Sequence, residues 1–181
     1  MTIKQVRLEK PSAGWMKLNT DRASNNVLGA AGEGGLIRDD KGNWVRGFSR
    51  KLGKVNSFMA EIWALRDGLL LCHQLKLDVV IIELDAKALV DALNNPMYAN
   101  SVISPLFDDC RVLMARLPRF CIRHIYREAN KCVNWLANIS ILQTLDFVMH
   151  SCPLVDLLSF VEVDCLGLYS SRLCPEPLFS S

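Results

Sequence analysis

The sequence predicts an α/β domain in which a five-stranded mixed sheet carries helices on both faces. Three observations predict this class: period-two patterning before the first long helix, a continuous apolar run at residues 79–84 after it, and amphipathic helical segments in the second half of the chain. The expected order of elements is βββαβαβα, in which two helices between the last two strands are counted together. This order implies a mixed sheet with helices packed on its faces.

The first three strands are expected to form an antiparallel meander. Met16, Leu18 and Thr20 alternate with polar residues, which is the period of a strand. A glycine-rich segment from Gly29 to Leu36 follows, and the turn signal Asp-Lys-Gly-Asn at residues 40–43 separates it from the next strand-like run.

A long helix is expected after the meander. Asn56 or Ser57 can cap its N-terminus, because either side chain can accept from backbone N–H groups that lack a partner in the helix. One apolar stripe then runs along the helix at steps of three and four residues. The stripe consists of Phe58, Ile62, Leu65, Leu69 and Cys72.

The remaining elements alternate between strands and helices. The apolar run at 79–84 is expected to be a strand buried on both faces. A short helix over 86–93 and an amphipathic helix over 104–117 follow. Residues 120–126 are expected to form the fifth strand, and residues 128–138 the last helix.

The chain divides into three parts at the level of sequence. Residues 1–13 are a polar lead-in, and residues 14–140 hold the predicted α/β domain. Residues 141–181 are rich in apolar residues but have no sustained period, and three prolines interrupt them. We therefore expect this last part to be an irregular extension that packs against the domain or is partly mobile.

Charge alone does not assign a function. The formal net charge of +2 is too small to indicate a nucleic-acid-binding protein, although basic residues crowd one stretch. That stretch is either an ordinary solvated surface or a set of phosphate contacts. Its members are Arg111, Arg116, Arg119, Arg123, Arg127 and Lys131.

The N-terminus lacks the apolar core of a signal peptide, and no stretch has the length of a membrane span, so we expect an intracellular protein of the nucleus or cytoplasm. The seven cysteines form no CxxC pair and are expected to be reduced and mostly buried. A zinc site is not expected, because His73, His124 and His150 are not at ligand spacing from cysteine pairs.

Three acids stand at the ends or edges of the predicted elements. Asp21 ends the first strand, Glu61 lies in the first turns of the long helix, and Asp85 follows the buried strand. A carboxylate at the end of a buried strand is unfavourable unless it is paired, hydrogen-bonded or holding a cation. Three such groups in one place would suit Mg²⁺; the alternative is that each acid faces water separately.

These segments carry a specific resemblance. The chain from about Trp15 to Asn138 resembles the ribonuclease H (RNase H) type-1 superfamily, and most of all the plant RNase H-like domains related to non-LTR retroelement ribonuclease H. The resemblance rests on KLNTDRAS, GGLIRDDKGNWVRGFSRKL, FMAEIWALRDGL, IIELDAKALVDAL and HIYREANKCVNWLAN, and the C-terminal DCLGLYSSRLCP also resembles the end of those proteins. It implies a nuclease that hydrolyses the RNA strand of RNA–DNA hybrids with two Mg²⁺ ions, for which Mn²⁺ can substitute.

The resemblance also implies which residues form the catalytic and metal-binding site. Asp21, Glu61 and Asp85 match the first three of the family's four acids, and Asn134 stands where the fourth acid is usual. An asparagine oxygen can coordinate Mg²⁺ but brings no charge, so weaker metal binding is expected. Arg22 replaces a usual glycine and could compete with metal for Asp21.

Ala86 departs from the family as well, since a small hydroxyl residue usually follows the third acid. Together with the residues at positions 22 and 134, it keeps two alternatives open. One is a non-catalytic nucleic-acid-binding module derived from a retroelement RNase H, and the other is an interaction domain that kept only the fold.

Substrate recognition would depend on the shape of the hybrid and on its 2′-OH groups. The candidate nucleic-acid-binding residues are Asn19, Asn25, Asn56, Arg123, Arg127 and Lys131. Asn56 has the alternative of being only a helix cap. Asn130 is expected only to order the start of the last helix, and His124 to be an ordinary strand residue. We expect a monomer that binds nucleic acid and no membrane.

Overall fold

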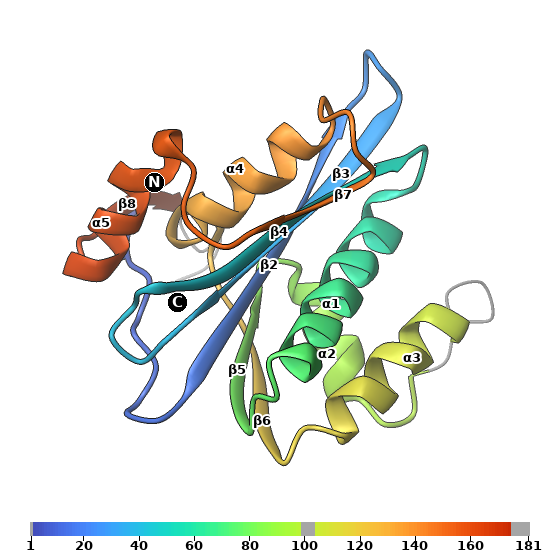
Figure 1. The fold of residues 1–181 in the computed structure, drawn as a ribbon, viewed down its shortest axis with the longest axis horizontal. Helices are drawn as coiled ribbons and strands as arrows, with labels where there is room; N and C mark the ends of the chain where they lie inside the picture. Colours follow the sequence, from blue (N-terminus) through green and yellow to red (C-terminus); the bar gives the residue numbers. More distant parts are fainter. Residues whose placement is uncertain (1, 99–103, 175–181) are drawn as a thin grey trace, which may run out of the picture.

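A six-stranded mixed sheet forms the centre of the structure (Figure 1). The computed structural model describes residues 2–98 and 104–174. The strands lie in the order β6-β5-β2-β3-β4-β7. Their bounds are β2 (Met16–Asn25), β3 (Ala30–Arg38), β4 (Trp44–Gly53), β5 (Val79–Leu84), β6 (Arg119–His124) and β7 (Phe147–His150).

The pairing of these strands confirms the predicted meander. β2, β3 and β4 pair antiparallel in sequence, while β5 pairs parallel to β2 on one side and to β6 on the other. Asn25 closes the β2–β3 hairpin, because its Oδ1 accepts hydrogen bonds from the backbone N–H groups of Val27 and Leu28, each at 3.0 Å. The interior of β5 is buried, as expected for a strand covered on both faces.

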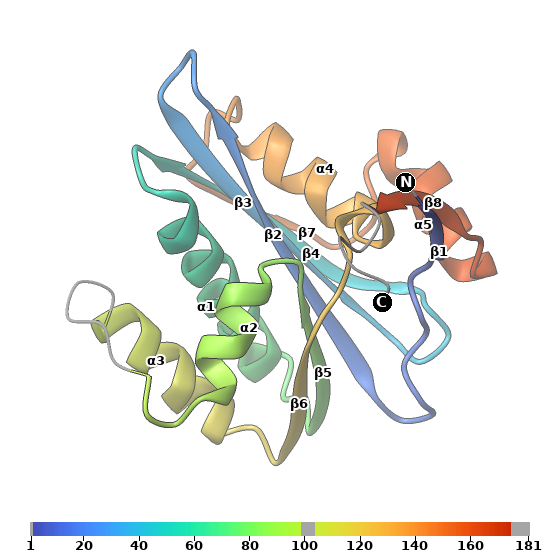
Figure 2. The ribbon, with the colours of Figure 1, turned by 180° about the vertical axis from the view of Figure 1, so that it is seen from behind.

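Helices cover both faces of the sheet (Figures 1 and 2). One layer contains α1 (Ser57–Gln74), which packs on β2 and β3, together with α2 (Lys87–Asn94) and α3 (Ser104–Ala115). The opposite layer contains α4 (Lys131–Ser140). The helices α2, α3 and α4 begin and end within three residues of their predicted bounds, and the α/β class with a mixed sheet is confirmed.

The glycine-rich sequence of β3 has a packing role. A Cβ added to Gly34 would lie 2.7 Å from the backbone nitrogen of Ala137 in α4. Only a residue without a side chain lets the helix approach the sheet this closely, and such an approach is one reason for a glycine inside a strand. This contact sets the position of α4 and therefore of Asn134, which it carries.

The long helix α1 follows its sequence pattern. Asn56 caps it, since Asn56 Oδ1 accepts from the backbone N–H of Met59 at 2.8 Å. The predicted stripe lies against the sheet and α3, with all but its first member fully buried and Phe58 partly buried. The opposite side of the same core contains Leu18, Ile37 and Phe48.

The C-terminal part is more regular than the sequence indicates. Residues 141–174 were expected to be irregular, but they contain β7, the 3₁₀ helix η2 (Val155–Leu157), α5 (Leu158–Leu166) and β8 (Ser170–Cys174). The strand β7 extends the sheet beyond β4, so the sheet has six strands and not the predicted five. At this edge Phe147 stacks on Phe48 with ring centroids 5.9 Å apart. The strands β7 and β8 are too short to show a period, and the apolar residues of α5 do not gather on one face of the helix. Residues 175–181 lie outside the described part.

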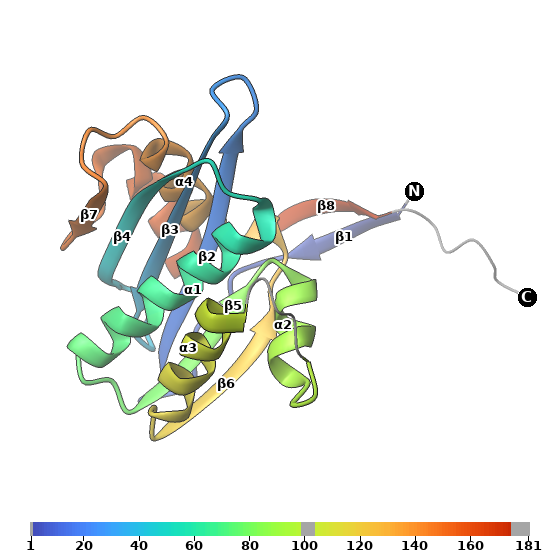
Figure 3. The same cartoon turned by 90° about the vertical axis from the view of Figure 1, so that its right-hand side faces the viewer.

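The polar lead-in also contains a strand, which the sequence did not predict. β1 (Thr2–Val6) pairs antiparallel with β8, and the two strands form a separate ribbon beside the main sheet (Figure 3). Residues 2–6 are therefore joined to residues 170–174 by backbone hydrogen bonds. We call this pair of strands the terminal ribbon.

The burial of the cysteines and the presence of a membrane-spanning helix are two further features that the sequence predictions concern. All seven cysteines lie in the described residues and are free thiols, but only Cys72, Cys110 and Cys132 are buried, so the expectation of mostly buried cysteines is wrong. Among residues 2–98 and 104–174, no helix combines the length and apolar character that crossing a membrane requires.

A buried ion pair attaches α5 to the sheet. Arg38 Nη2 in β3 donates to Asp164 Oδ2 at 2.6 Å, and both side chains are at least 90% buried. The Cys132 thiol of α4 donates to the same oxygen at 3.3 Å. Burial raises the pKa of Asp164, and the charge of Arg38 opposes that shift. Each partner therefore needs the other to remain charged in this desolvated position.

We expect Asp164→Ala to lower the free energy of unfolding by roughly 3–5 kcal/mol, because it leaves the guanidinium of Arg38 buried without its carboxylate. Urea unfolding monitored by circular dichroism measures this change. The matched control is Asp91→Ala, which breaks the exposed Lys87–Asp91 pair and should change stability by at most about 0.5 kcal/mol. Equal small losses in both variants would contradict this role for Asp164.

Candidate active site

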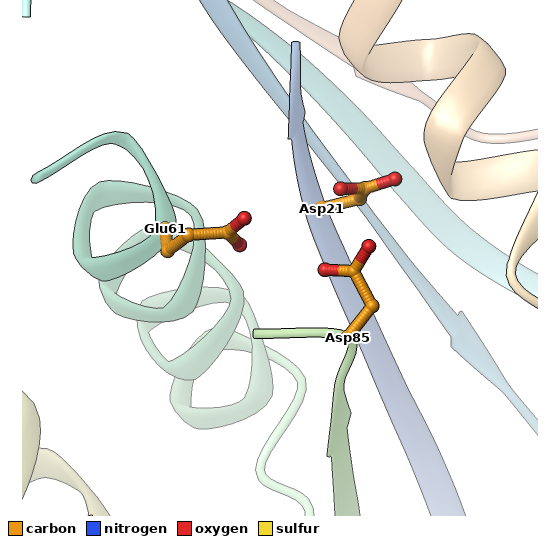
Figure 4. Close-up of side chains that lie close together, drawn as sticks. All are labelled: Asp21, Glu61 and Asp85. Atoms are coloured by element: carbon orange, nitrogen blue, oxygen red, sulfur yellow. The ribbon is translucent and has the colours of Figure 1, made fainter. Parts of the chain in front are cut away.

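Three carboxylates converge at one place on the sheet (Figure 4). Asp21 lies on β2, Asp85 directly follows β5, and Glu61 reaches over from α1. Thr20 is in register with Leu84 across the parallel pair β2–β5. The residue that follows each of them in sequence, Asp21 or Asp85, is an acid. One carboxylate oxygen from each of the three acids lies within 4.8 Å of the others.

The structure therefore brings the three predicted acids together. One detail differs from the expectation, since Asp21 lies inside β2, which continues to Asn25, and does not end it. Asp21 and Glu61 are buried, and Asp85 is partly exposed. The cluster is thus open to solvent on the side of Asp85.

Burial and mutual repulsion raise the pKa values of these acids. Burial and then the charge of Asp85 raise the pKa of Asp21 to about 7 and that of Glu61 to about 9. Burial also raises the pKa of Asp85, while the positive charge of Arg127 opposes the shift. The protein thus holds three carboxyl groups where their ionised forms are unfavourable unless a cation joins them.

The unused oxygens point to a cation ligand set. Glu61 Oε2 and Asp85 Oδ1 are buried and have no hydrogen-bond partner among the described residues. Buried polar atoms normally have partners, so two orphaned carboxylate oxygens in one cluster require an explanation. An all-oxygen, carboxylate-rich set is the type that Mg²⁺ and Mn²⁺ prefer, and the residues present therefore fit such an ion.

Asn134 lies beside Asp21 but presents a hydrogen-bond donor to it. Its Nδ2 donates to Asp21 Oδ2 at 2.9 Å. Asn138, one turn later in α4, donates to the backbone oxygen of Asn134 at 2.7 Å and to its Oδ1 at 3.3 Å. For Asn134 to offer its oxygen to a cation, its side-chain amide would have to turn over and lose both side-chain contacts.

Arg22 acts on a different acid from the one expected. Its Nε donates to Glu61 Oε1 at 3.3 Å, and its Nη1 donates to Ser24 Oγ at 3.3 Å. Only its backbone N–H bonds to Asp21, at Oδ1 and 2.7 Å. The expectation that the guanidinium competes for Asp21 is therefore wrong, and its electrostatic partner is Glu61. Neighbouring residues on a strand point to opposite faces, which explains the difference.

Asn19 does not lie where nucleic acid could reach it. It is fully buried, and its Nδ2 donates to Glu83 Oε2 at 3.0 Å. Lys17 Nζ and Arg123 Nε both donate to Glu83 Oε1 at 2.8 Å. The buried acid of β5 organises this group, so the expectation that Asn19 contacts substrate is wrong.

Asn25 and Asn56 lie on one surface near the N-terminus of α1. Together with Lys54 they line a hollow of about 430 Å³ between the β2–β3 hairpin and the loop that follows β4. Asn56 caps α1 and is also exposed on this surface, so its contact with nucleic acid stays a prediction.

The remaining candidates surround the last helix. Arg127 is exposed in the 3₁₀ helix η1 (Arg127–Ala129), and Lys131 begins α4. His124 ends β6, as predicted for a strand residue. Asn130 makes no side-chain cap; its Nδ2 donates to Thr20 O at 3.2 Å and joins the start of α4 to β2 beside Asp21.

The basic stretch does not form one surface. Arg111 donates to the backbone oxygens of Asn95 and Tyr98, and Arg119 packs over the ring of Trp15. Arg127 is the residue of this stretch whose charge acts on Asp21 and Asp85. Most of the stretch therefore has local structural roles, in line with the alternative of an ordinary basic surface.

Sequence reasoning missed two polar residues at the site. Asn138 was not identified, although its spacing of four residues from Asn134 in a helix is a usable signal. Glu33 of β3 was also missed; it is fully buried, pairs in register with Arg22, and lies 3.4 Å from Arg50 Nε. Burial and the neighbouring Asp67 raise the pKa of Glu33 well above its ordinary value.

Comparison with known proteins gives the same family as the motifs. The model of the family described as reverse transcriptase-like matches residues 19–140. A protein of Arabidopsis thaliana, named as a candidate ribonuclease H protein, is 34% identical over 173 residues. That alignment covers 91% of this chain but 28% of the Arabidopsis protein, so the chain spans less than a third of its relative.

Solved structures confirm the fold. RNase H1 from the halophilic archaeon Halobacterium salinarum NRC-1 superposes with a TM-score of 0.65 at 21% identity, over 70% of this chain and 97% of that one. LC11-RNase H1, solved in complex with an RNA/DNA hybrid, gives a TM-score of 0.63 at 26% identity, over 70% of this chain and 96% of that one. Neither comparison covers the whole of the chain.

The raised pKa of Glu61 predicts a pH-dependent stability in metal-free buffer. Its folded-state pKa of about 9 lies above the ordinary value of 4.5, so the folded chain binds more protons between these values. The free energy of unfolding therefore falls as pH rises through that window. The free energy of unfolding of Glu61→Gln should therefore rise, relative to that of the natural protein, by up to about 1.4 kcal/mol per pH unit.

Urea unfolding in EDTA, from about pH 5 to about pH 8, measures this difference. The control is Glu162→Gln, which changes an exposed glutamate of α5 and should stay parallel to the natural protein. A stability difference for Glu61→Gln that is constant with pH would show that Glu61 ionises normally in the folded chain.

Proposed function

The chain belongs to the reverse transcriptase-like family, and from this premise we propose that it is a ribonuclease that hydrolyses the RNA strand of RNA–DNA hybrids with divalent metal ions. The observation that carries the proposal is the convergence of Asp21, Glu61 and Asp85, with two of their buried oxygens unpartnered. Such a group of acids is unfavourable without cations and fits two-metal phosphodiester hydrolysis.

The choice of substrate draws on relatives and on the surface around the acids. The Arabidopsis relative is named for ribonuclease H, and LC11-RNase H1 was solved with an RNA/DNA hybrid. On this chain, Asn25, Lys54 and Asn56 offer amide and ammonium groups beside α1. These groups can bind sugar hydroxyls and phosphates. The shape of the duplex and its 2′-OH groups distinguish a hybrid from DNA.

The chain's own residues would divide the work as follows. Asp21, Glu61 and Asp85 would hold Mg²⁺, for which Mn²⁺ can substitute, and Asn134 would keep Asp21 in position through its N–H donor. When bound, such ions supply an activated water and neutralise charge on the leaving oxygen. Arg127, whose charge already acts on Asp21 and Asp85, would attract the phosphate toward these acids.

A second candidate function is nucleic-acid binding without hydrolysis. It is favoured by the two contacts that occupy the acids from within the chain, namely Arg22 on Glu61 and Asn134 on Asp21. Arg22 supplies a positive charge, and Asn134 supplies a hydrogen-bond donor, where a bound cation would otherwise contact these acids. The two functions differ in cleavage and share binding.

The proposal predicts cleavage of the RNA strand in an end-labelled RNA–DNA hybrid when Mg²⁺ or Mn²⁺ is added. Asp21→Asn should lower the rate by at least about 100-fold, because it removes the most buried charge of the cluster. The control Asp91→Asn changes an exposed acid of α2 and should leave the rate unchanged. A hybrid that is bound but never cut with either metal would establish the non-catalytic alternative.

Asn134→Asp tests the amide position. The change adds a negative charge to the cluster, so metal affinity should rise roughly tenfold, and cleavage at low Mg²⁺ should rise with it. Thermal unfolding with and without Mg²⁺ provides a readout independent of activity, and the stabilisation by Mg²⁺ should be larger in Asn134→Asp.

The same experiment with Arg22→Gly separates the two functions. If Arg22 holds Glu61 away from metal, Asn134→Asp alone should do little, and only the pair of changes should produce Mg²⁺-dependent stabilisation. Absence of that stabilisation in the natural protein and in all three variants would exclude a metal site at these residues.

A further inference from the structure

A second polar hollow lies outside the acidic cluster, between the terminal ribbon and the carboxyl end of β6. It has a volume of about 340 Å³. The terminal ribbon itself lies outside residues 19–140, which the family model matches. Figure 3 shows the ribbon projecting from the side of the domain where β6 ends. The residues of β1 and β8 thus add a surface that the matched region does not contain.

Basic side chains dominate this hollow. Lys4 and Arg7 line it, and their side-chain partners among the described residues are the tyrosines Tyr126 and Tyr169, not carboxylates. Arg123 also lines it and pairs with Glu83, but Lys17 neutralises the same carboxylate from the interior. The exposed Glu9 is the other lining acid. The hollow therefore carries a net positive charge and fits an anion.

Aromatic rings lie beneath the unpaired cations. The guanidinium carbon of Arg7 is 4.8 Å from the ring centroid of Tyr169, and that tyrosine is 59% exposed. Lys4 Nζ lies 4.6 Å from the ring centroid of Tyr126 and donates to its hydroxyl at 3.2 Å. An exposed ring next to a cation is the arrangement on which proteins stack the bases of single-stranded nucleic acid.

The hollow is adjacent to the acidic cluster along the chain and across the sheet. His124, which lines it, is in register with Leu84, the residue before Asp85. The intervening 3₁₀ helix η1 contributes to both places: Ala129 lines the hollow, while Arg127 acts on the acids. A strand that leaves the acidic cluster over η1 would therefore enter the hollow.

We propose that this hollow binds single-stranded nucleic acid that continues from the end of a hybrid, with its phosphates on Lys4 and Arg7 and a base on Tyr169. This inference rests on the proposed function for its position relative to the hybrid. The ribbon pairing of β1 with β8 keeps Lys4 and Tyr169 on one surface although they are distant in sequence. The hollow extends the nucleic-acid contacts of the chain beyond the duplex.

The test compares binding of a fluorescently labelled blunt hybrid with that of the same hybrid carrying a single-stranded overhang. Ca²⁺ replaces Mg²⁺ so that binding is measured without cleavage. The natural protein should bind the overhang hybrid more tightly. Lys4→Ser/Arg7→Ser should remove that gain and lower the slope of log affinity against log salt by about 1.4, since each phosphate contact on a single strand contributes about 0.7.

Two substitutions of Tyr169 test whether a base stacks on its ring. Tyr169→Leu should reduce affinity for the overhang hybrid by about fivefold or more, and Tyr169→Phe should retain it, because stacking needs the ring and not the hydroxyl. The charge-matched control is Lys76→Asn/Arg116→Ser. These cations precede β5 and β6, at the opposite end of the sheet, and asparagine tolerates the positive φ of Lys76. The control variant should still bind the overhang hybrid more tightly than the blunt hybrid.

The outcomes separate this inference from the proposed function. If the overhang does not increase affinity, or if Lys4→Ser/Arg7→Ser and the control variant lose equal affinity, binding at the hollow is contradicted while hybrid cleavage can still hold. If the blunt hybrid is neither bound nor cut but a labelled single strand binds through Lys4 and Arg7, the proposed hydrolysis fails and the hollow stands.

Discussion

Repulsion among three neighbouring carboxylates, two of them buried and the third partly exposed, is the constraint on which the rest of this structure depends. The parallel pairing of β2 with β5 places Asp21 beside Asp85, and α1 brings Glu61 over both. Hydrophobic packing of α1 on the sheet opposes this repulsion, since the charges alone would drive the elements apart. The fold therefore keeps a site that favours cations, and its stability and its function are linked through the same residues.

The chain supplies partial substitutes for a cation at this site. Arg22 pairs with Glu61, and Asn134 donates to Asp21, with its amide held by Asn138. Each contact relieves some of the repulsion that three carboxylates produce, and each would compete with a bound metal. The two proposed functions, weakened hydrolysis and binding without hydrolysis, thus differ in how readily Arg22 and Asn134 would give up these contacts to a cation.

The sequence predicts the central fold and the three acids well, because long periodic segments and acids beside buried strands leave clear patterns. The strands and helix of residues 141–174 escape prediction, since β7 and β8 are too short for a period and are defined by partners far away in sequence. The direction in which a side chain points is equally hard to predict from the sequence. Asn19 follows Leu18 next to the site in sequence but turns inward to Glu83, and Arg22 turns to Glu61. Such choices depend on tertiary contacts that no local pattern contains.

We claim that Asp21, Glu61 and Asp85 together bind a divalent cation. The most direct measurement is an anomalous difference map from crystals of the natural protein grown with Mn²⁺ near neutral pH. We expect a Mn²⁺ peak in contact with all three carboxylates, with the Arg22 guanidinium displaced from Glu61. A map without such a peak, in which Arg22 remains on Glu61 and the Asn134 amide nitrogen remains on Asp21, would contradict the claim.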